Sequence, residues 1–243
     1  MKTLVYSHSD YSDILKIQLD HISKFLNPTL LINENNNLHD DVILYDNRFH
    51  YGERIFSSIK DIKEDYIFFI HDIDIVLNLD VNYFNKLIDT MKKNNIDRID
   101  LKHQNANNNL LNIEDEMFIY KTSFPQDQYV YNVNPSIWKT KSMINTFYLF
   151  RNETYRSIEH SKIQSYCSDK FRFYNTFTQK PINMGYYNSY EKFKFLHISH
   201  YGQFMPDDIK INKISKTNND IYQNIINKYN LKNVNRKFKT EMH

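Results

Sequence analysis

The chain of 243 residues contains only three glycines, and this shortage excludes several familiar kinds of site. Gly52, Gly185 and Gly202 are too few and too far apart to build G-x-G-x-x-G or G-x-x-x-x-G-K-[ST]. The usual dinucleotide and P-loop phosphate cradles are therefore absent. The sequence also has no G-x-S-x-G, the nucleophile elbow of α/β-hydrolases.

Cysteine is equally scarce, since Cys167 is the only one. A single cysteine excludes an internal disulfide and any cysteine-rich zinc site, and it favours a reducing compartment. A catalytic thiol is the alternative, but the surrounding Ser-Tyr-Cys-Ser-Asp carries no local signature of one. We expect Cys167 to be inert.

The sequence lacks long apolar runs and a basic stripe. No stretch approaches the roughly 20 apolar residues that cross a bilayer, and MKTLVYSHSDYSD is broken too early for a signal peptide. The formal net charge is +2 and the cations are dispersed, so nucleic acid is not an expected partner. These features predict a soluble, cytoplasmic protein without a transmembrane segment.

What the sequence does contain is an alternation of strand-like and helix-like patterns in its N-terminal part. Strands are predicted at Thr3–Ser7, Thr29–Ile32, Val42–Tyr45, Tyr66–His71 and Arg98–Lys102. Helices are predicted at Asp10–Leu26, Tyr51–Lys63 and Asn82–Lys93. Such alternation predicts an α/β fold with a mostly parallel, Rossmann-like central sheet flanked by helices.

The rest of the chain is less regular. Strands are predicted at Met117–Tyr120, Tyr129–Asn132 and Phe193–Ser199, helices at Lys139–Phe150 and Ile221–Tyr229, and a solvated loop at Gln104–Asn112. We expect one domain over 1–243. Its parts would be a nucleotide-binding half (1–103), an acceptor half with a smaller mixed β region (104–205) and a helical tail (206–243).

The stretch YIFFIHDIDIVLNLD (66–80) places two acids at the tip of a hydrophobic strand. Ligands of open α/β sheets bind beyond the carboxyl ends of the strands, where Asp72 and Asp74 are expected. In an extended chain, residues i and i+2 share a face about 6.6 Å apart, so both carboxylates could converge on Mg²⁺ or Mn²⁺ carrying a diphosphate. The alternative is that both acids merely cap the following turn or helix.

Three stretches give the chain a resemblance to a known family: YSHSDYSDIL (6–15), FHYGERIFSSIKDIKEDYIFFIHDIDIVL (49–77) and YNVNPSIWKTKSMINTFYLFRNETYRSIE (131–159). In this order they resemble GT-A-type nucleotide-sugar glycosyltransferases with a D-x-D motif. More narrowly, they are similar to a bacterial and giant-virus group of such enzymes. The resemblance spans most of residues 1–160 and implies a GT-A-like fold, a nucleotide-sugar donor (a UDP-sugar favoured) and a glycan or glycoconjugate acceptor.

The same resemblance implies roles on the donor side. Tyr6, Ser7 and His8 would lie against the base or ribose, Asp72 would touch the ribose or donor sugar, and Asp74 would bind the metal. Arg54 could reach the diphosphate or base, because an arginine fork suits phosphate oxygens. Its alternative is an ordinary surface cation on a helix.

For His71, which precedes the acidic pair, we expect a supporting hydrogen bond.

On the acceptor side, the resemblance implies that Trp138 could stack on a sugar, with core packing as the alternative. Glu153 and Glu159 are candidates for the general base that removes the acceptor hydroxyl proton, and we favour Glu159. A solvated helix residue is the alternative for Glu159. The resemblance also implies a late histidine as an extra metal ligand. FLHISHYGQF (195–204) offers His197 and His200, of which we favour His200.

The sequence thus predicts a metal-dependent glycosyltransferase using Mn²⁺ or Mg²⁺. Two alternatives remain open from the residues. One is a metal-dependent phosphohydrolase that uses the same acids, although the haloacid-dehalogenase pattern wants the pair on the first strand. The other is a non-catalytic nucleotide-sugar or carbohydrate-binding module.

Overall fold

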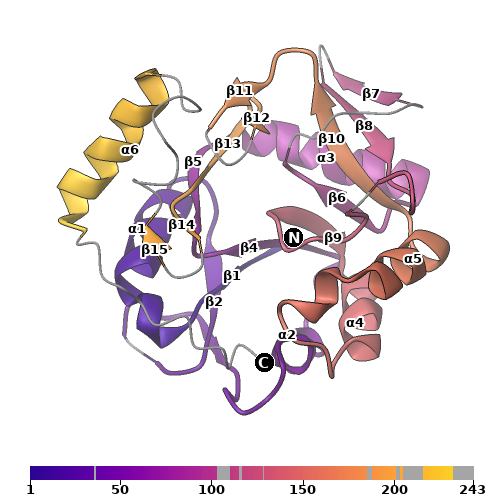
Figure 1. Cartoon of the computed structure of the whole chain (residues 1–243), viewed down its shortest axis with the longest axis horizontal. Coiled ribbons are helices and arrows are strands. Elements are labelled where there is room, and N and C mark those ends of the chain that lie inside the picture. The colour runs from indigo at the N-terminus through magenta and orange to yellow at the C-terminus, as the bar shows by residue number, and fades with distance from the viewer. Residues whose placement is uncertain are drawn as a thin grey trace.

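The computed structural model describes residues 1–35, 37–102, 110–114, 117–127, 129–184, 188–200, 203–204 and 216–231. At its centre is a sheet in which nine strands of the described chain lie in the order β3-β2-β1-β4-β9-β6-β10-β8-β7 (Figure 1). The strands are β1 (Lys2–Tyr6), β2 (Pro28–Ile32), β3 (Val42–Leu44), β4 (Tyr66–His71), β6 (Arg98–Asp100), β7 (Leu110–Glu114), β8 (Met117–Lys121), β9 (Ser136–Lys139) and β10 (Phe173–Thr178).

The sheet is mixed but mostly parallel. Strands β3, β2, β1 and β4 pair in parallel, as do β6 and β10. Strand β9 runs against both β4 and β6, and β8 runs against both β10 and β7. The predicted α/β fold with a mostly parallel central sheet is confirmed. Its parallel strands bring their carboxyl ends to one edge, where the predicted acids lie.

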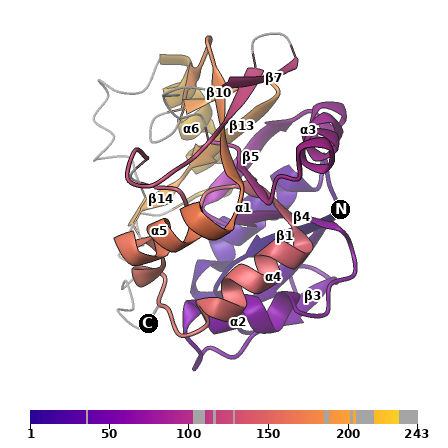
Figure 2. The same ribbon diagram turned by 90° about the vertical axis from the view of Figure 1, so that its right-hand side faces the viewer.

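Helices cover both faces of the sheet. On one face, α1 (Ser12–Ile22) and α3 (Val81–Asn94) pack with β1 and β4 into one apolar cluster. On the other face, α2 (Tyr51–Ile59), α4 (Thr140–Leu149) and α5 (Ser161–Lys170) form a second cluster, and α4 and α5 lie towards the viewer in Figure 2. Short 3₁₀ turns, η1 (Ser9–Tyr11) and η2 (Ser157–Glu159), precede α1 and α5.

A second, smaller β region lies beside the main sheet. Strand β5 (Asp74–Leu79) pairs antiparallel with β13 (Phe193–His197), and this ribbon packs on α1 and α6 (Lys216–Tyr229), left of centre in Figure 1. The remaining short strands pair two by two: β11 (Ile182–Asn183) with β12 (Asn188–Ser189), and β14 (Ser199–His200) with β15 (Gln203–Phe204). Among the helices of the described ranges, none is long and apolar enough to cross a bilayer.

Two secondary-structure predictions are wrong, and several strands, β5 among them, were not predicted. Residues 74–79 form a strand because β13, distant in sequence, pairs with them. Residues 129–132 are not a strand, because the Gln164 amide takes the backbone bonds of Tyr131 that a neighbouring strand would take. The second wrong prediction is the loop at Gln104–Asn112: its residues 110–112 belong to β7, and its residues 104–109 lie outside the described residues. The predicted helix Lys139–Phe150 is confirmed as α4, one residue shorter at each end and preceded by the strand β9. The division into a donor half and an acceptor half stays a prediction.

Candidate functional site

The candidate site lies where β1 and β4 end side by side. Tyr6 stands beside His71 in their parallel register, and the next residues, Ser7 and Asp72, continue from the strand ends. The Asp72 backbone N–H donates to the Tyr6 carbonyl at 3.0 Å, and the Ser7 hydroxyl donates to Asp72 Oδ2 at 2.5 Å. Ser7 and Asp72 are both buried. The fold therefore brings Ser7 and Asp72, two of the predicted donor-side residues, into direct contact.

Asp72 and Asp74 do not share a face of one strand as expected. Strand β4 stops at His71, Asp72 and Ile73 form a turn, and β5 starts at Asp74. The extended geometry assumed from the sequence is therefore wrong for this pair. Asp72 contacts Ser7, while Asp74 contacts a residue of the β5–β13 ribbon.

That residue is His197. Its Nδ1 lies 2.7 Å from Asp74 Oδ1, and both side chains are buried. The contact follows from the antiparallel register, which sets His197 directly opposite Asp74. Gln18 of α1 fixes the start of β5, because its amide donates to the Asp74 carbonyl at 2.9 Å and accepts from the Val76 N–H at 3.0 Å. His200, the histidine favoured from the sequence, lies in β14, and its side chain is outside what the structure describes.

The carboxyl group of Asp72 is held in an unusual state. Burial raises its pKa to about 7; the hydrogen bond from Ser7 opposes this shift and the negative charge of Asp74 adds to it. A cation beside Asp72 and Asp74 would offset the cost of burying a charged carboxylate and would reduce the repulsion between the two acids. Carboxylate oxygens are the protein donors that Mg²⁺ and Mn²⁺ prefer.

The described residues contain no group of three or more His, Cys, Asp or Glu side chains placed to hold an ion. A cage made by the protein alone is therefore not formed in this part of the chain. Mg²⁺ is ordinarily held by one or two carboxylates together with substrate phosphates. Asp72 and Asp74 are the two carboxylates at this edge that such a mode could use.

His71 belongs to an aromatic cluster under the site. Its Nε2 lies 3.0 Å from the Tyr51 hydroxyl, and its ring packs against Tyr6, Phe69 and Tyr155 at centroid distances of 5.2–5.7 Å. Burial lowers its pKa to about 4, so the imidazole is neutral at pH 7. The supporting hydrogen bond expected for His71 is the one with Tyr51.

Arg54 is buried rather than a surface cation, so the alternative weighed from the sequence is wrong. Its Nε donates to the Phe49 carbonyl at 2.7 Å and its Nη2 to the Asn47 carbonyl at 2.6 Å. The guanidinium lies 5.5 Å from the ring centre of Tyr45, which stacks on Tyr6 at 5.2 Å. Arg54 thus fastens the loop between β3 and α2 beside the end of β1.

His8 follows the end of β1, two residues after Tyr6. Its Nδ1 accepts from the Asp10 backbone N–H at 3.1 Å, and its Nε2 lies 3.1 Å from the Asn47 amide nitrogen. The ring is buried, with 8% of its residue surface exposed. His8 therefore links the end of β1 to the loop that Arg54 fastens.

Trp138 lies in the core, with 1% of its surface exposed. The rings of Tyr131, Phe147 and Phe173 surround it at 5.2–6.3 Å, and its Nε1 donates to the Ser136 hydroxyl at 3.0 Å. Stacking on a sugar, as the resemblance implied, would need an exposed ring face. Core packing, the alternative, describes its position.

The two candidate bases differ in what holds them. Glu159 Oε1 accepts from the Val133 N–H at 3.2 Å, and burial raises the pKa of its carboxyl. For Glu153, the backbone carbonyl accepts from the Gly52 N–H at 3.1 Å. Glu159 is therefore not a freely solvated residue, and its carboxylate is fixed by a neighbouring segment.

Lys102 is a largely buried cation near Glu159 and Asp74. Burial lowers the pKa of Lys102, and the carboxylates of Asp100, Asp74 and Glu159 raise it in turn. Its ammonium group therefore lies within electrostatic range of all three. Lys102 and Asp100 were not singled out in the sequence, although both lie at the end of a predicted strand, the signal that identified Asp72.

Comparisons with known proteins give a partial likeness of shape. No protein-family model matches the chain, and no curated protein matches it either. Among solved structures, it is similar to the bifunctional IspDF from Campylobacter jejuni, with 11% identity, a TM-score of 0.44, and coverage of 72% of this chain and 48% of that one.

Two further structures show a similar degree of likeness. TarS 1–349 from S. aureus in complex with UDP-GlcNAc has 14% identity and a TM-score of 0.43, covering 74% of this chain and 57% of that one. A197 from STIV has 13% identity and a TM-score of 0.43, covering 86% and 92%. The chain thus spans about half the length of the IspDF and TarS chains.

Proposed function

We propose that this chain is a metal-dependent glycosyltransferase that moves a sugar from a nucleotide-sugar donor to a hydroxyl of a glycan or glycoconjugate. Among the possible donors we favour a UDP-sugar. The observation that carries the proposal is the acidic pair beyond β4, with Asp72 bonded to Ser7 and Asp74 to His197. The pair lies at the carboxyl edge of a mostly parallel sheet, where α/β folds bind ligands. The ordered motif resemblance supports the same function.

The donor would lie along the ends of β1 and β4. Tyr6, Ser7 and His8 would hold the base or ribose, and Arg54 would hold the loop that borders them. Ser7 keeps the Asp72 carboxylate turned towards this edge through its hydroxyl. Asp74 and His197 would face the diphosphate, and His200 remains a further candidate there.

Asp72 and Asp74 would hold Mg²⁺ or Mn²⁺, whose positive charge would stabilise the negative charge on the leaving nucleotide. In the reaction, the acceptor oxygen forms a bond to the anomeric carbon, and the bond from that carbon to the diphosphate oxygen breaks. The hydroxyl proton goes to the Glu159 carboxylate. A base whose pKa burial raises towards neutrality suits this role. Glu153 is the alternative base.

The test is nucleotide release from a panel of nucleotide sugars, measured with Mn²⁺ and with EDTA. We expect metal-dependent UDP release from at least one UDP-sugar, with a loss of about a hundredfold or more in Asp74→Asn. Release of inorganic phosphate from simple phosphate esters, without nucleotide release, would instead identify the phosphohydrolase. Metal-dependent UDP binding without either activity would identify the binding module.

A further inference from the structure

Residues 131–134 form a buried segment without regular secondary structure just before β9. Tyr131, Asn132 and Asn134 each expose 7% or less of their surface. Buried backbone N–H and C=O groups need partners, and an irregular segment cannot take them from a sheet or helix ladder. The partners here are side chains.

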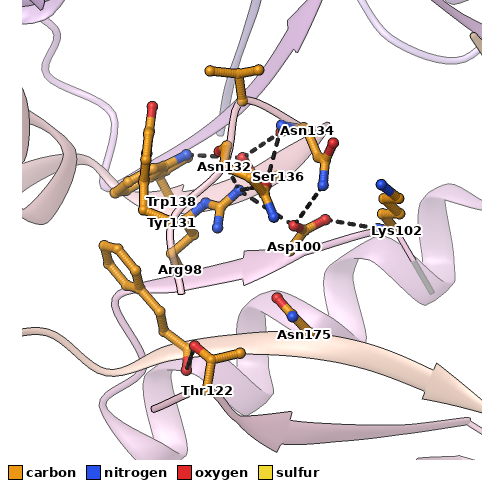
Figure 3. A network of polar contacts seen from close by, with 12 residues as sticks. Arg98, Asp100, Lys102, Thr122, Tyr131, Asn132, Asn134, Ser136, Trp138 and Asn175 are labelled. Atoms are coloured by element: carbon orange, nitrogen blue, oxygen red, sulfur yellow. Dashed lines mark hydrogen bonds and ion pairs between the residues drawn. The ribbon is translucent and has the colours of Figure 1, made fainter. Parts of the chain in front are cut away.

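Four side chains supply these partners, and Figure 3 shows those of Arg98, Asn132 and Ser136. The Gln164 amide bonds both the N–H and the C=O of Tyr131, at 2.7 and 2.8 Å. The Asn132 carbonyl accepts from Arg98 at 2.9 Å, and Asn132 Oδ1 accepts from the Asn134 N–H at 3.2 Å. The Ser136 hydroxyl donates to the Asn134 carbonyl at 3.0 Å. The conformation of the segment is therefore fixed by side chains, of which Gln164, Arg98 and Ser136 lie outside it.

Arg98 is the central member of this network, and it is fully buried. In the described part of the chain, the polar contacts of its side chain are made by Nη2: 2.9 Å to the Asn132 carbonyl, 2.9 Å to Asn132 Oδ1 and 3.6 Å to Asp100 Oδ2. Within the described residues, its Nε and Nη1 have no hydrogen-bond partner. The guanidinium carbon instead lies 5.2–5.8 Å from the ring centres of Tyr131, Trp138 and Phe173. The rings orient the guanidinium so that Nη2 points at Asn132.

Asp100, the last residue of β6, also holds the segment 131–134 in place. Its Oδ2 accepts from the Asn134 side-chain amide at 3.0 Å, and its Oδ1 from the Lys102 N–H at 2.8 Å. A buried ion pair of this kind adds little net stability compared with apolar residues of the same volume. What the pair defines is geometry, because it fixes Asn132 and Asn134 on either side of Val133.

Val133 is the residue that touches the candidate base. Its N–H donates to Glu159 Oε1 at 3.2 Å. The position of the Glu159 carboxylate therefore depends on a backbone N–H that lies between two fixed asparagines, Asn132 and Asn134. We propose that Arg98 is a positioning residue, which acts through Asn132 and Val133 to hold the Glu159 carboxylate at the carboxyl edge of the sheet. The inference rests on the proposed function in one respect, the role of Glu159 as base.

The first test is a double-mutant cycle with Arg98→Met and Glu159→Gln, measured by UDP release. Arg98→Met keeps an apolar side chain among the rings but removes Nη2. We expect kcat to fall about tenfold to a hundredfold while KM for the donor stays within about twofold. In Glu159→Gln, adding Arg98→Met should lower kcat no further. Additive effects, or a change confined to KM, would overturn the proposal.

A second pair of variants guards against misfolding of Arg98→Met. Asn132→Leu removes Oδ1, one of the two Asn132 oxygens that Arg98 Nη2 bonds, whereas Asn132→Asp keeps an oxygen in its place. We expect Asn132→Leu to reproduce the kcat loss and Asn132→Asp to recover most of it. Equal losses in both variants would contradict positioning through this acceptor.

A readout without catalysis separates this inference from the proposed function. By NMR, we expect hydrogen exchange of the Val133 amide to accelerate about tenfold or more in Arg98→Met and Asn132→Leu. We also expect the carboxyl titration of Glu159 to move to higher pH in Asn132→Leu, which keeps the Arg98 charge, because the hydrogen bond from Val133 is weakened. If the wild type transfers no sugar, the proposed function fails. The Val133 exchange rate and the Glu159 titration then still test whether Arg98 positions Glu159. Unchanged exchange and titration would overturn the link even in an active enzyme.

Discussion

Asp74 and His197 face each other across the antiparallel ribbon of β5 and β13, with Oδ1 and Nδ1 2.7 Å apart. A histidine in this place can join Asp74 around a bound ion. In His197→Ala, we expect the rise in Tm that Mn²⁺ with UDP gives the wild type to shrink by half or more, because ligands that bind only the folded state stabilise it. Each variant is compared with its own metal-free Tm.

His200→Ala is the matched variant for that experiment, because the sequence favoured His200 as the ligand. We expect it to keep most of the Mn²⁺-dependent rise. Loss of the rise in His200→Ala with retention in His197→Ala would reverse the assignment.

Arg54 supplies a prediction about the loop between β3 and α2. A lysine cannot bond the Asn47 and Phe49 carbonyls together while lying on Tyr45. We expect Arg54→Lys to lower the free energy of unfolding by about 1–3 kcal/mol, measured by urea denaturation. The control is Arg48→Lys in the same loop, whose exposed side chain pairs with Asp46, and here we expect a change within about 0.5 kcal/mol. Equal effects would show that the buried bonds of Arg54 contribute nothing.

Gly52 allows the segment after α4 to approach α2. A Cβ at this position would lie 2.0 Å from the Phe150 carbonyl oxygen, and backbone there cannot yield as a flexible side chain could. We expect Gly52→Ala to lower the free energy of unfolding by about 1–3 kcal/mol and to loosen the Gly52–Glu153 backbone bond. Lys60→Ala, at the exposed end of α2, is the control and should change stability little. An unaltered Tm in Gly52→Ala would contradict this packing.

Glu159 gives a pH-dependent prediction whose sign follows from its raised pKa. The folded state favours the protonated carboxyl, so this favourable contribution is complete below the unfolded pKa of about 4.3 and disappears as pH rises through the folded pKa. Relative to Glu159→Gln, the wild type should therefore lose stability across that interval and change no further above it. Denaturation of both proteins at several pH values between 4 and 8 measures this, and a difference that grows in favour of the wild type would refute it.

Local patterns predicted the parts of the fold that depend on neighbours in sequence. The apolar strand Tyr66–His71 and the helix around Asn82–Lys93 were found because burial follows their periodicity. Strand β5 was missed because its partner β13 is more than a hundred residues away in the sequence, so the pattern of residues 74–79 does not indicate the pairing. Residues 129–132 have a strand-like pattern, but the Gln164 side chain satisfies the backbone at Tyr131.

The candidate site was predictable to the same extent. Strand-end reasoning located Asp72 and Asp74, and the motif resemblance located Ser7 and Glu159. Neither could reveal that Asp74 meets His197, because the register of two distant strands decides it. Arg98 was missed for another reason: a buried arginine within a strand looks like an ordinary surface cation until the three rings around it are known.

The proposed function requires that the acidic pair bind a nucleoside diphosphate together with a divalent cation. Isothermal titration of UDP into the wild-type protein, first with Mn²⁺ and then with EDTA, measures this binding. We expect binding with Mn²⁺ that weakens at least about tenfold with EDTA and in Asp74→Asn. A folded protein that binds neither UDP nor GDP in the presence of Mn²⁺, or binds them equally well with EDTA, would contradict it.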